Sequence, residues 1–390
     1  MLNVFHFSNK PAYPLKDGGC IAISSILNSL HLDSNVNVHH FTLSTFKHLF
    51  NEDEYPDSLR SSMKIDSVHI KTNTHILAAL YYLLINQSYN VVRFYDKEVE
   101  KRITDIINKH HFDVVLLESI YLLPYLHIFK EKGLKVVLRT HNVEHQIWSS
   151  LAKNTKFLPK KWYFNKLAQQ LKKYELEKCL EVDGIISITK NDARFFEKIN
   201  PNVKTTSIPP IITTKTETAN YDLSDFYFLG AMDWQPNVEG IRWFIDEVIP
   251  QGLKDSKFYL AGKSLNKEEF HHPGVVNLGE IENAMDFIDA HGICLIPLHS
   301  GSGLKIKLLE NMALGKPIIT TSEGVRGVEV QHENEVLIAD HPDDFRNQMK
   351  RLSQSKELRQ TIGSNAKQFI NENFNQEILT KKLIEFIRNI

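Results

Sequence analysis

A glycine-rich turn followed by two lysines is the strongest chemical signal in the sequence. The turn Gly301–Gly303 follows an apolar run and precedes a helical pattern, and Lys305 and Lys307 come soon after it. Glycines let backbone amides approach an anion closely, and a helix N-terminus adds free N–H groups and partial positive charge. Lysines at this end oppose the helix dipole, so an anionic ligand bound there would remove the conflict.

Glu310 adds a second polar group to the same predicted helix. It lies eight residues beyond Ser302, which corresponds to roughly 12 Å of helix. That length suits a diphosphate at one end and a ribose diol at the other, because a carboxylate accepts two hydroxyl hydrogen bonds well. A solvated helix with a Lys307–Glu310 ion pair would show the same residues, since a glycine-rich turn before a helix is a weak signal alone.

Strands and helices alternate along the first half of the chain. Short apolar runs rich in β-branched residues are typical of buried strands, and helical stretches separate them. This alternation predicts an α/β domain with a parallel, doubly wound sheet. The expected strands are 2–7, 91–94, 114–117, 136–138 and 184–188, and the expected helices are 21–30, 97–109, 121–132 and 191–198.

The alternation stops after residue 208 and restarts after residue 222. The intervening segment is rich in Pro and Thr and lacks periodicity, so we predict a linker at 209–222. We expect an N-terminal domain at 1–208, a second doubly wound domain at 223–372, and a C-terminal helix within 373–390 that packs back on the N-terminal domain. The expected strands of the second domain are 226–229, 257–260, 275–278, 293–297, 317–320 and 335–338, with helices at 238–248, 304–314, 343–352 and 357–371. A cleft between the carboxyl ends of the two sheets is the expected ligand site.

Composition and charge narrow the class of protein. The 390 residues carry 46 basic and 47 acidic side chains, which argues against a dedicated nucleic-acid binder. Cys20, Cys179 and Cys294 have neither metal-ligand nor redox spacing, which indicates buried thiols in a reducing compartment. The N-terminus lacks a signal-peptide pattern, and the apolar run 76–85 is far short of the roughly 20 residues of a spanning helix. We therefore expect a cytoplasmic protein.

Three segments together resemble one known family. They are 138–148 (LRTHNVEHQIW), 228–250 (FLGAMDWQPNVEGIRWFIDEVIP) and 300–329 (SGSGLKIKLLENMALGKPIITTSEGVRGVE), with a weaker match at 13–19 (YPLKDGG). In this order they resemble the family 4, or group 1, glycosyltransferases. The resemblance implies the GT-B fold, in which two Rossmann-like domains face each other across a cleft. It also implies retaining transfer of a sugar from a nucleoside diphosphate sugar to an acceptor hydroxyl.

One position departs from the pattern of that family. The common pattern has two glutamates separated by seven residues; Glu310 matches the second, whereas Ser302 stands at the first. A Gly-Ser-Gly variant of this loop occurs within the family. The loop amides of Ser302, Gly303 and Leu304 are therefore the candidates for the donor contact that the glutamate usually makes.

The resemblance assigns candidate roles in both domains. His141, at a strand end, would face the donor sugar, although a histidine there could instead cap the following helix. Lys307 and Glu310 complete the catalytic candidates. Glu144 and His145 could orient His141, bind the acceptor or simply begin a helix. The donor-binding candidates lie at turns and strand ends, namely Gly18, Gly19, Gly230, Lys263, Gly279, Ile281, Gly301, Ser302, Gly303, Leu304 and Lys305.

Several candidates also have purely structural explanations. Gly18 and Gly19 could form a tight turn, and Lys263 could be a solvated side chain. Trp234 is expected in the core, with Asn237 as a helix cap. The segment 153–178 carries eight lysines and several aromatic residues; it could rest on an anionic membrane surface near a lipid-linked acceptor, or it could be a solvated helix.

Stabilising the departing diphosphate is the physical requirement of the expected reaction. Lys305, Lys307, the loop amides and the helix dipole can do this without a metal, and no Asp-x-Asp pattern ends a strand. We therefore predict a metal-independent hexosyltransferase with no cofactor besides its donor substrate. It would act on a glycan or lipid-linked acceptor in surface polysaccharide or glycoconjugate synthesis, at the inner membrane face or in the cytoplasm. A sugar-nucleotide epimerase on the same fold and a non-catalytic nucleotide-sugar-binding protein are the alternatives.

Overall fold

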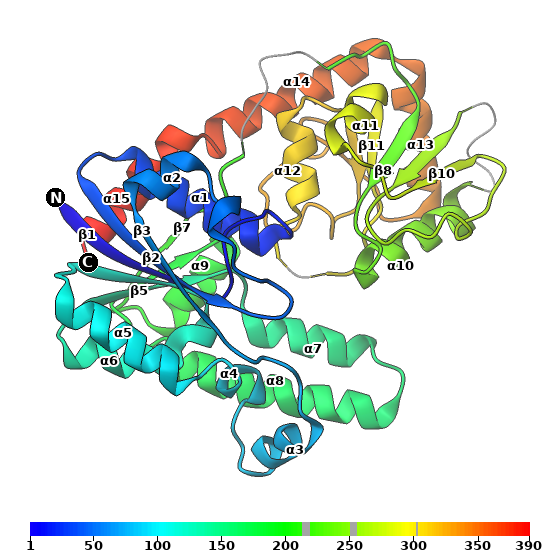
Figure 1. Cartoon of the computed structure of the whole chain (residues 1–390). Coiled ribbons are helices and arrows are strands. Elements are labelled where there is room, and N and C mark those ends of the chain that lie inside the picture. The colour runs from blue at the N-terminus through cyan, green and yellow to red at the C-terminus, as the bar shows by residue number, and fades with distance from the viewer. Residues whose placement is uncertain (213–218, 250–255, 302) are drawn as a thin grey trace. The chain divides into compact units, whose positions relative to one another are not determined.

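The chain forms two compact units. The computed structural model describes residues 1–212, 219–249, 256–301 and 303–390 (Figure 1). Unit 1 comprises Met1–Ile211 and Gln376–Ile390, and unit 2 comprises Ile212–Asn375. We expected the first domain to end at residue 208; unit 1 runs to Ile211, and the rest of the expected linker lies in unit 2 or, for 213–218, outside the described residues.

Unit 1 is built on seven parallel strands in the order β3-β2-β1-β4-β5-β6-β7. Chain order reverses between β1 and β4, the kind of position at which doubly wound sheets bind ligands outside the carboxyl ends of their strands. The strands are β1 (Leu2–Ser8), β2 (Val36–Ser44), β3 (Lys64–His69), β4 (Val114–Glu118), β5 (Lys135–Thr140), β6 (Gly184–Ser187) and β7 (Lys204–Ser207).

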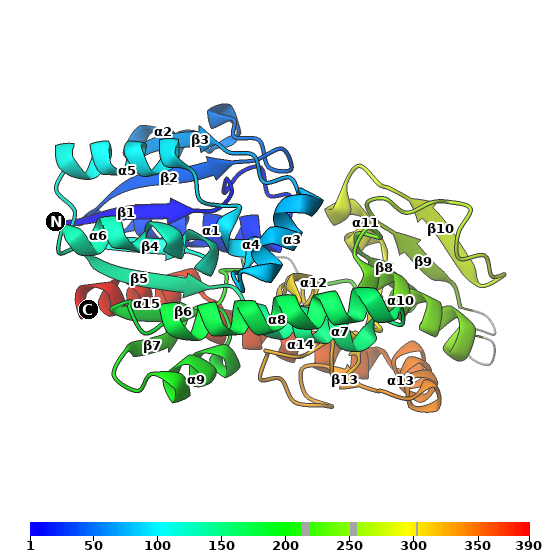
Figure 2. The ribbon, with the colours of Figure 1, turned by 90° about the horizontal axis from the view of Figure 1, so that it is seen from below.

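Helices cover both faces of this sheet. They are α1 (Gly18–Leu32), α2 (Asp57–Ser62), α3 (Ile76–Leu84), α4 (Tyr89–Val92), α5 (Lys97–Lys109), α6 (Leu126–Glu131), α7 (Glu144–Asn154), α8 (Leu158–Lys178), α9 (Lys190–Ile199) and α15 (Gln376–Arg388), with 3-10 helices η1 (Glu52–Glu54) and η2 (Ile120–Tyr125). Alternate strand residues point to opposite faces. Leu116 and Val137 pack with α1 and α15, whereas Leu117 and Leu138 pack with α5, α6 and α8. Figure 2 shows α7 and α8 side by side.

Three predictions for unit 1 were wrong. Segment 91–94 was predicted as a strand but overlaps α4, because a short apolar run does not distinguish a buried strand from a buried helical turn. Strands β2, β3 and β7 were missed. Strand β2 carries His39, His40 and Thr42 in its buried part, and β3 and β7 are half-buried edge strands, so none of the three shows a clear apolar pattern. The single helix predicted at 121–132 is η2 followed by α6.

Unit 2 has six parallel strands in the order β10-β9-β8-β11-β12-β13. All six correspond to predicted strands, within two residues at each end. They are β8 (Phe226–Leu229), β9 (Phe258–Ala261), β10 (Val275–Gly279), β11 (Ile293–Ile296), β12 (Ile318–Thr320) and β13 (Leu337–Ile338). Chain order reverses between β8 and β11, so the turn after β11 lies at a second switch point.

The helices of unit 2 differ more from the predictions. They are α10 (Gln235–Trp243), the π-helical segment η3 (Phe244–Val248), α11 (Ala284–Ala290), α12 (Ile306–Ala313), α13 (Pro342–Gln354) and α14 (Lys356–Asn373). The predicted helix 238–248 is α10 continued by η3, and α11 was missed. No helix among the described residues combines the length and the hydrophobicity that crossing a membrane requires.

Candidate functional site

The turn between β11 and α12 has the backbone that its glycines predict. Gly301 has φ +110° and Gly303 has φ +76°, both in the region that disfavours other residues. A Cβ at Gly301 would lie 2.9 Å from the Trp234 ring, so a side chain there would also clash. Ser302 lies outside the described residues. Gly301 therefore packs directly against the Trp234 ring, which a residue with a side chain could not do.

Lys305 holds this turn in shape. Its side chain is buried, and Nζ donates to the carbonyl oxygens of Gly301 at 2.9 Å and Gly303 at 3.0 Å. Nζ also lies 3.6 Å from Oε1 of Glu323. Burial lowers the pKa of Lys305, and the charge of Glu323 opposes that shift. Lys305 thus binds two carbonyl groups of the loop and stabilises the conformation of the loop.

Lys307 occupies a different environment, among aromatic rings. Its Nζ donates to Oδ1 of Asn237 at 2.6 Å and lies 4.2 Å from the ring centroid of Phe228. Asn237 is itself fixed, because its Nδ2 donates to the carbonyl of Ala231 at 2.6 Å. Burial lowers the pKa of Lys307 to about 7, while nearby Cys294 and Glu310 oppose that shift. The ammonium is thus held by one polar partner and is poorly solvated.

Two structural predictions about this region were wrong. Asn237 is not the cap of α10; the helix already begins at Gln235, and Asn237 instead orients Lys307. Trp234 is not a core residue, since it is 36% exposed and covers the glycine turn. Lys307 and Glu310 do not form the ion pair that a solvated helix would allow. Lys307 donates to Asn237, and Glu310 is exposed on α12.

Gly230 provides the space that Lys307 needs. A Cβ at this position would lie 2.5 Å from Nζ of Lys307 and 2.8 Å from the Phe228 ring. Gly230 also joins the strand ends, because its N–H donates to the carbonyl of Ala261 at 3.1 Å. The structure therefore brings together Gly230 and Lys307, both of which the sequence singled out, with Asn237 as a third member.

The remaining candidates of unit 2 lie farther along the strand ends. Lys263 is exposed just after β9, and Gly279 ends β10 with φ +72°. The N–H of Gly262 donates to the carbonyl of Gly279 at 3.0 Å, which ties these two strand ends together. Ile281 is half-buried after β10, and Leu304 is half-buried before α12. Among the residues that the structure describes, no hydrogen bond or ion pair joins Lys263, Gly279 or Ile281 to Lys307.

In unit 1 a buried carboxylate organises the candidate histidine. Oε2 of Glu118 accepts from Nε2 of His141 at 2.7 Å and from Nη1 of Arg139 at 2.9 Å, and Oε1 contacts Nε2 of His6 at 3.1 Å. Glu118, Arg139 and His6 are fully buried, whereas the His141 side chain is 16% exposed. Burial would raise the pKa of Glu118, but Arg139 and the two histidines hold that pKa well below its usual range. The next residue, Ser119, has φ +149°, a strained value of the kind found near functional sites.

The network continues from Glu118 into neighbouring strands. Nδ1 of His6 lies 2.9 Å from Nδ1 of His40, whose Nε2 lies 3.2 Å from the Tyr55 hydroxyl. One placement of the ring protons satisfies all three hydrogen bonds. Nε2 of His6 then donates to Glu118, Nδ1 of His40 donates to Nδ1 of His6, and the Tyr55 hydroxyl donates to Nε2 of His40. The sequence did not point to these residues, because they come from separate strands. The available signal was polar residues inside apolar strands, such as Glu118 ending VVLLE.

Glu118 also fixes the tautomer of His141. Since a carboxylate only accepts, the 2.7 Å contact places the ring proton of His141 on Nε2. Arg139 at 3.5 Å from the same nitrogen is a much longer contact. Burial lowers the pKa of His141, and the hydrogen bond to Glu118 opposes that shift. Neutral His141 therefore keeps Nδ1 as an acceptor.

Glu144 and His145 contact α8, not His141. Their backbone N–H groups donate to Glu175 at 2.9 and 3.3 Å, and Nδ1 of His145 lies 2.5 Å from Oε2 of the same carboxylate. The Tyr121 hydroxyl donates to Glu144 at 2.8 Å. Burial raises the pKa of Glu144 to about 7; the bond from Tyr121 opposes the shift, and the charge of Glu175 adds to it. These contacts match the simpler alternative, in which both residues begin a helix.

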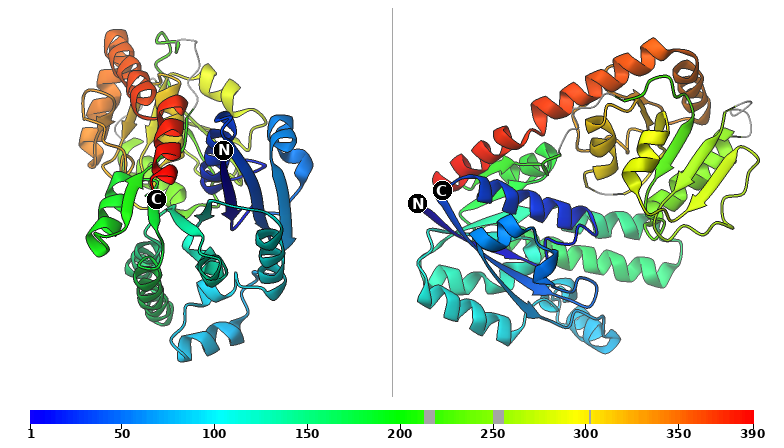
Figure 3. Two further views of the ribbon diagram at one scale, coloured as in Figure 1. Left: turned by 90° about the vertical axis from the view of Figure 1, so that its left-hand side faces the viewer. Right: turned by 45° about the horizontal axis from the view of Figure 1, so that its top comes forward.

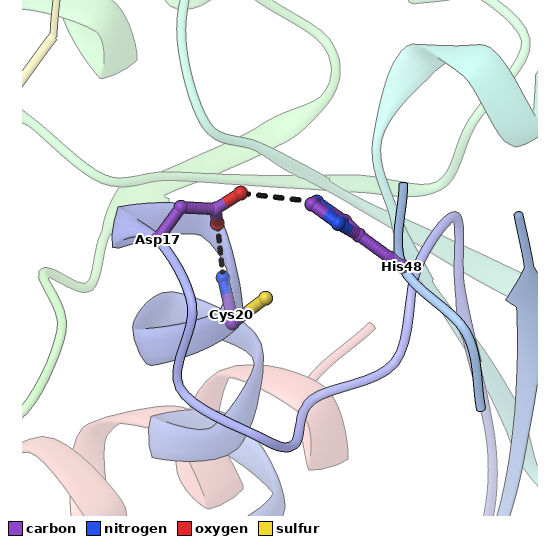
Figure 4. Close-up of side chains that lie close together, drawn as sticks. All are labelled: Asp17, Cys20 and His48. Atoms are coloured by element: carbon purple, nitrogen blue, oxygen red, sulfur yellow. Dashed lines mark hydrogen bonds and ion pairs between the residues drawn. The ribbon is translucent and has the colours of Figure 1, made fainter. Parts of the chain in front are cut away.

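Gly18 and Gly19 open α1 behind an N-cap aspartate. Oδ1 of Asp17 accepts from the N–H of Cys20 at 2.9 Å and from Nζ of Lys10 at 2.6 Å, and Oδ2 lies 3.1 Å from Nε2 of His48. Figure 4 shows Asp17 between Cys20 and His48, with its carboxylate bonded to both residues. A Cβ at Gly19 would clash with the Lys10 ammonium, so the glycine makes room for a cation here, as Gly230 does in unit 2.

Asp17, Cys20 and His48 place their potential metal-ligand atoms within 4.8 Å of one another. The negative charge of the Asp17 carboxylate is already balanced by the Lys10 ammonium, however. Burial would raise the pKa of Asp17, but Lys10 and the other contacts lower it to about 2. Burial raises the pKa of the Cys20 thiol. A cation at this point would have to displace the Lys10 ammonium, so the contacts of the cluster explain it as a helix cap with its counterions.

Sequence comparisons relate the chain to glycosyltransferases. Residues 224–355 match the family model described as "Glycosyl transferases group 1". Over 342 residues the chain is 24% identical to an "Uncharacterized 44.6 kDa protein in cps region" of Klebsiella pneumoniae, covering 80% of this chain and 86% of that protein. Over 120 residues it is 33% identical to an uncharacterized glycosyltransferase of Methanocaldococcus jannaschii, covering 30% of this chain and 29% of that one.

Solved structures establish the fold along the whole chain. Sucrose-phosphate synthase of Thermosynechococcus elongatus has a TM-score of 0.70 at 14% identity, covering 100% of this chain and 99% of that one. TarM of S. aureus, in a complex that includes UDP, has a TM-score of 0.68 at 12% identity, covering 99% and 100%. HepE of Anabaena in complex with UDP-glucose has a TM-score of 0.61 at 12% identity, covering 99% and 100%. With its two parallel-sheet units the chain has the GT-B fold, as the sequence resemblance predicted.

Proposed function

We propose that this chain is a group 1 glycosyltransferase that moves a sugar, with retention, from a nucleoside diphosphate sugar to an acceptor hydroxyl. The observation that carries the proposal is Lys307, poised by Asn237 beside Gly230 within the segment that matches the family model. The relatives solved with UDP and UDP-glucose support a nucleoside diphosphate sugar as donor.

The chemistry asks the site to stabilise charge on a leaving diphosphate. As the bond between C1 of the sugar and the β-phosphate oxygen breaks, negative charge develops on that oxygen. Lys307 and the backbone amides of the glycine turn, with the N-terminus of α12, are the groups that would meet it. Glu310 is exposed on the same helix and would accept the ribose hydroxyls. The acceptor oxygen bonds to C1 from the same face, and its proton passes to the departing phosphate.

His141 supplies a hydrogen-bond acceptor to this scheme. Glu118 holds the Nε2 proton, so the free Nδ1 would accept from a sugar hydroxyl. Glu118 is therefore a positioning residue, and Arg139 keeps its carboxylate ionised. Burial lowers the pKa of His141, which favours the neutral ring that this role requires. Its expected contribution is orientation of the sugar.

The biological setting is part of the same proposal. A relative from a cps region fits a role in surface polysaccharide or glycoconjugate synthesis. The acceptor would then be a glycan or a lipid-linked sugar, and segment 153–178 would give peripheral contact with a membrane. We propose that the reaction uses no metal, since Lys307 and the helix N-terminus supply the positive charge.

A donor panel with two variants tests the proposal. Nucleoside diphosphate sugars that differ in base and sugar are offered with a glycan acceptor, and product formation and anomeric configuration are followed by NMR. Lys307→Ala and Glu310→Ala should each reduce transfer on the order of 100-fold. Lys350→Ala, an exposed change on α13, should leave transfer unchanged.

Each alternative class gives its own result in this assay. Near-normal transfer by both site variants would refute the site assignment. A product with inverted C2 configuration, formed without acceptor, would identify a sugar-nucleotide epimerase. Absence of binding by every nucleoside diphosphate, measured by calorimetry, would identify a non-catalytic protein.

A further inference from the structure

Helix α3 in unit 1 exposes a nearly uncharged apolar surface. Ile76–Leu84 contains only aliphatic residues, alanine and tyrosine, and just two of its side chains, Ala79 and Leu83, are buried. Figures 1 and 3 show α3 at the outer edge of its unit. Large exposed apolar patches on folded proteins mark sites of interaction. The exposed large side chains are Ile76 (75%), Leu77 (83%), Leu80 (48%), Tyr81 (57%), Leu84 (84%) and Ile85 (43%).

Helix α8 places positive charge beside this surface. Nε2 of Gln170 donates to the carbonyl of Leu83 at 3.1 Å, which joins the two helices. Lys166 and Lys173 lie four and three residues from Gln170, so they share its side of α8. Lys173 also lines one cavity with Asn86, which follows α3. The apolar surface therefore has lysines along its border.

Exposed aromatic and aliphatic side chains extend this character along α8. Trp162 is 62% exposed and stands four residues before Lys166, on the same stripe of the helix. Phe157 and Leu158, at the start of α8, are 67% and 74% exposed. Tryptophan and tyrosine favour the boundary between lipid chains and headgroups, and lysines favour anionic headgroups. The exposed apolar side chains therefore suit the acyl-chain region of a bilayer surface, and the lysines suit its anionic headgroups.

We propose that α3 inserts its exposed side into the interface of an anionic lipid bilayer, with the lysines of α8 bound to the headgroups. At about 1.5 Å per residue the helix is far too short to cross a hydrocarbon core of about 30 Å, so it lies in the membrane plane. Charge complementarity selects anionic lipid over a second copy of this chain, because two such borders of lysine would repel each other. The proposal rests on the peripheral membrane contact proposed above for 153–178 and adds α3 as the inserted element, but it does not depend on glycosyl transfer.

Vesicle flotation of the full chain tests this surface. Vesicles of phosphatidylcholine are compared with vesicles in which about one-third of the lipid is phosphatidylglycerol. The unmodified chain should float with the anionic vesicles and be released by salt. Leu77→Gln with Leu84→Gln should weaken the partition on the order of 100-fold, and Lys166→Gln with Lys173→Gln about tenfold on anionic vesicles only. Leu77, Leu84 and Lys173 are exposed and Lys166 is half-buried, so the variants should keep the melting temperature of the parent.

Matched controls use the same chemistry elsewhere in unit 1. Leu32→Gln with Ile378→Gln removes two exposed apolar side chains from α1 and α15, and Lys101→Gln with Lys109→Gln removes two charges from α5. Both controls should bind vesicles as the parent does. Equal weakening by the controls, unchanged binding of the α3 variant, or no flotation of the parent would each overturn the proposal. So would a dimer, seen by light scattering, that the α3 variant abolishes without any vesicle binding by the parent.

Discussion

Lys307 is a lysine whose charge depends on pH near neutrality. Burial lowers its pKa to about 7, so the free protein carries the ammonium below that pH and loses it as pH rises through 7. A bound diphosphate would favour the charged form. Donor binding at pH 8 should therefore take up to about one proton, and affinity should fall by up to about tenfold per pH unit above 7.

Calorimetry at pH 8 measures this proton uptake. The tightest-binding nucleoside diphosphate of the panel is titrated in buffers with different ionisation enthalpies, and the slope of the binding enthalpy gives the number of protons. Lys307→Arg keeps a charge throughout this pH range, so it should bind without the uptake. The same uptake in Lys307→Arg would assign the proton to another group.

The sequence singled out candidates at turns, at strand ends and along one helix, but it did not show which residues hold them in place. Lys307 and the glycine turn were found because spacing along one helix carries the signal. Asn237, which holds Lys307, comes from α10, 70 residues earlier. Glu118, which holds His141, comes from the neighbouring strand β4. Contacts across a sheet depend on strand order, which one sequence does not specify.

At the scale of elements, the start of α7 depends on a residue of α8. Val143 precedes the helix without a side-chain cap, and Glu175 accepts from the first two N–H groups of α7 and from the His145 ring. Glu175 is fully buried. A helical pattern in the sequence could predict α7 itself. It could not predict the role of Glu175, which caps this helix from 30 residues away. The errors at α4, β2, β3 and β7 have a related cause, since burial there is decided by tertiary neighbours.

Glu175→Ala should destabilise unit 1 by about 2–4 kcal/mol, because it leaves the His145 ring and two backbone amides buried without their acceptor. Thermal unfolding followed by circular dichroism should show a decrease in Tm of roughly 5–15 °C. Glu177→Ala, on the exposed side of α8, is the matched control and should change stability by less than about 0.5 kcal/mol. Equal Tm values for the two variants would show that the cap contributes little.

At the scale of the whole molecule, unit 1 is assembled from two distant stretches of chain. Its last helix, α15, follows all of unit 2 in sequence. The amphipathic pattern of this helix was visible in the sequence, and its apolar side chains join the same hydrophobic cluster as α1 and the strand residues Val4 and Val137. The C-terminal residues therefore complete the core of the N-terminal fold.

Removal of residues 376–390 should unfold unit 1 and leave unit 2 folded. Four side chains of α15 are buried, Leu379, Leu383, Ile384 and Ile387. At about 1.5–3 kcal/mol each, their burial contributes up to about 6–12 kcal/mol, which is comparable to the whole stability of a typical domain. Limited proteolysis should then degrade 1–211 while a fragment of unit 2 persists.

Two double alanine variants of α15 distinguish the effect of its buried side chains from the effect of its exposed ones. Lys381→Ala with Glu385→Ala replaces two exposed side chains and removes their 4.0 Å ion pair, which is worth little at a surface. This variant should resist protease as the parent does, whereas Leu383→Ala with Ile387→Ala should be cleaved within unit 1 because each truncation costs about 2–5 kcal/mol. If the deletion left 1–211 resistant, the strands and α1 would form a sufficient core alone. The return of the chain to unit 1 would then serve something other than its stability.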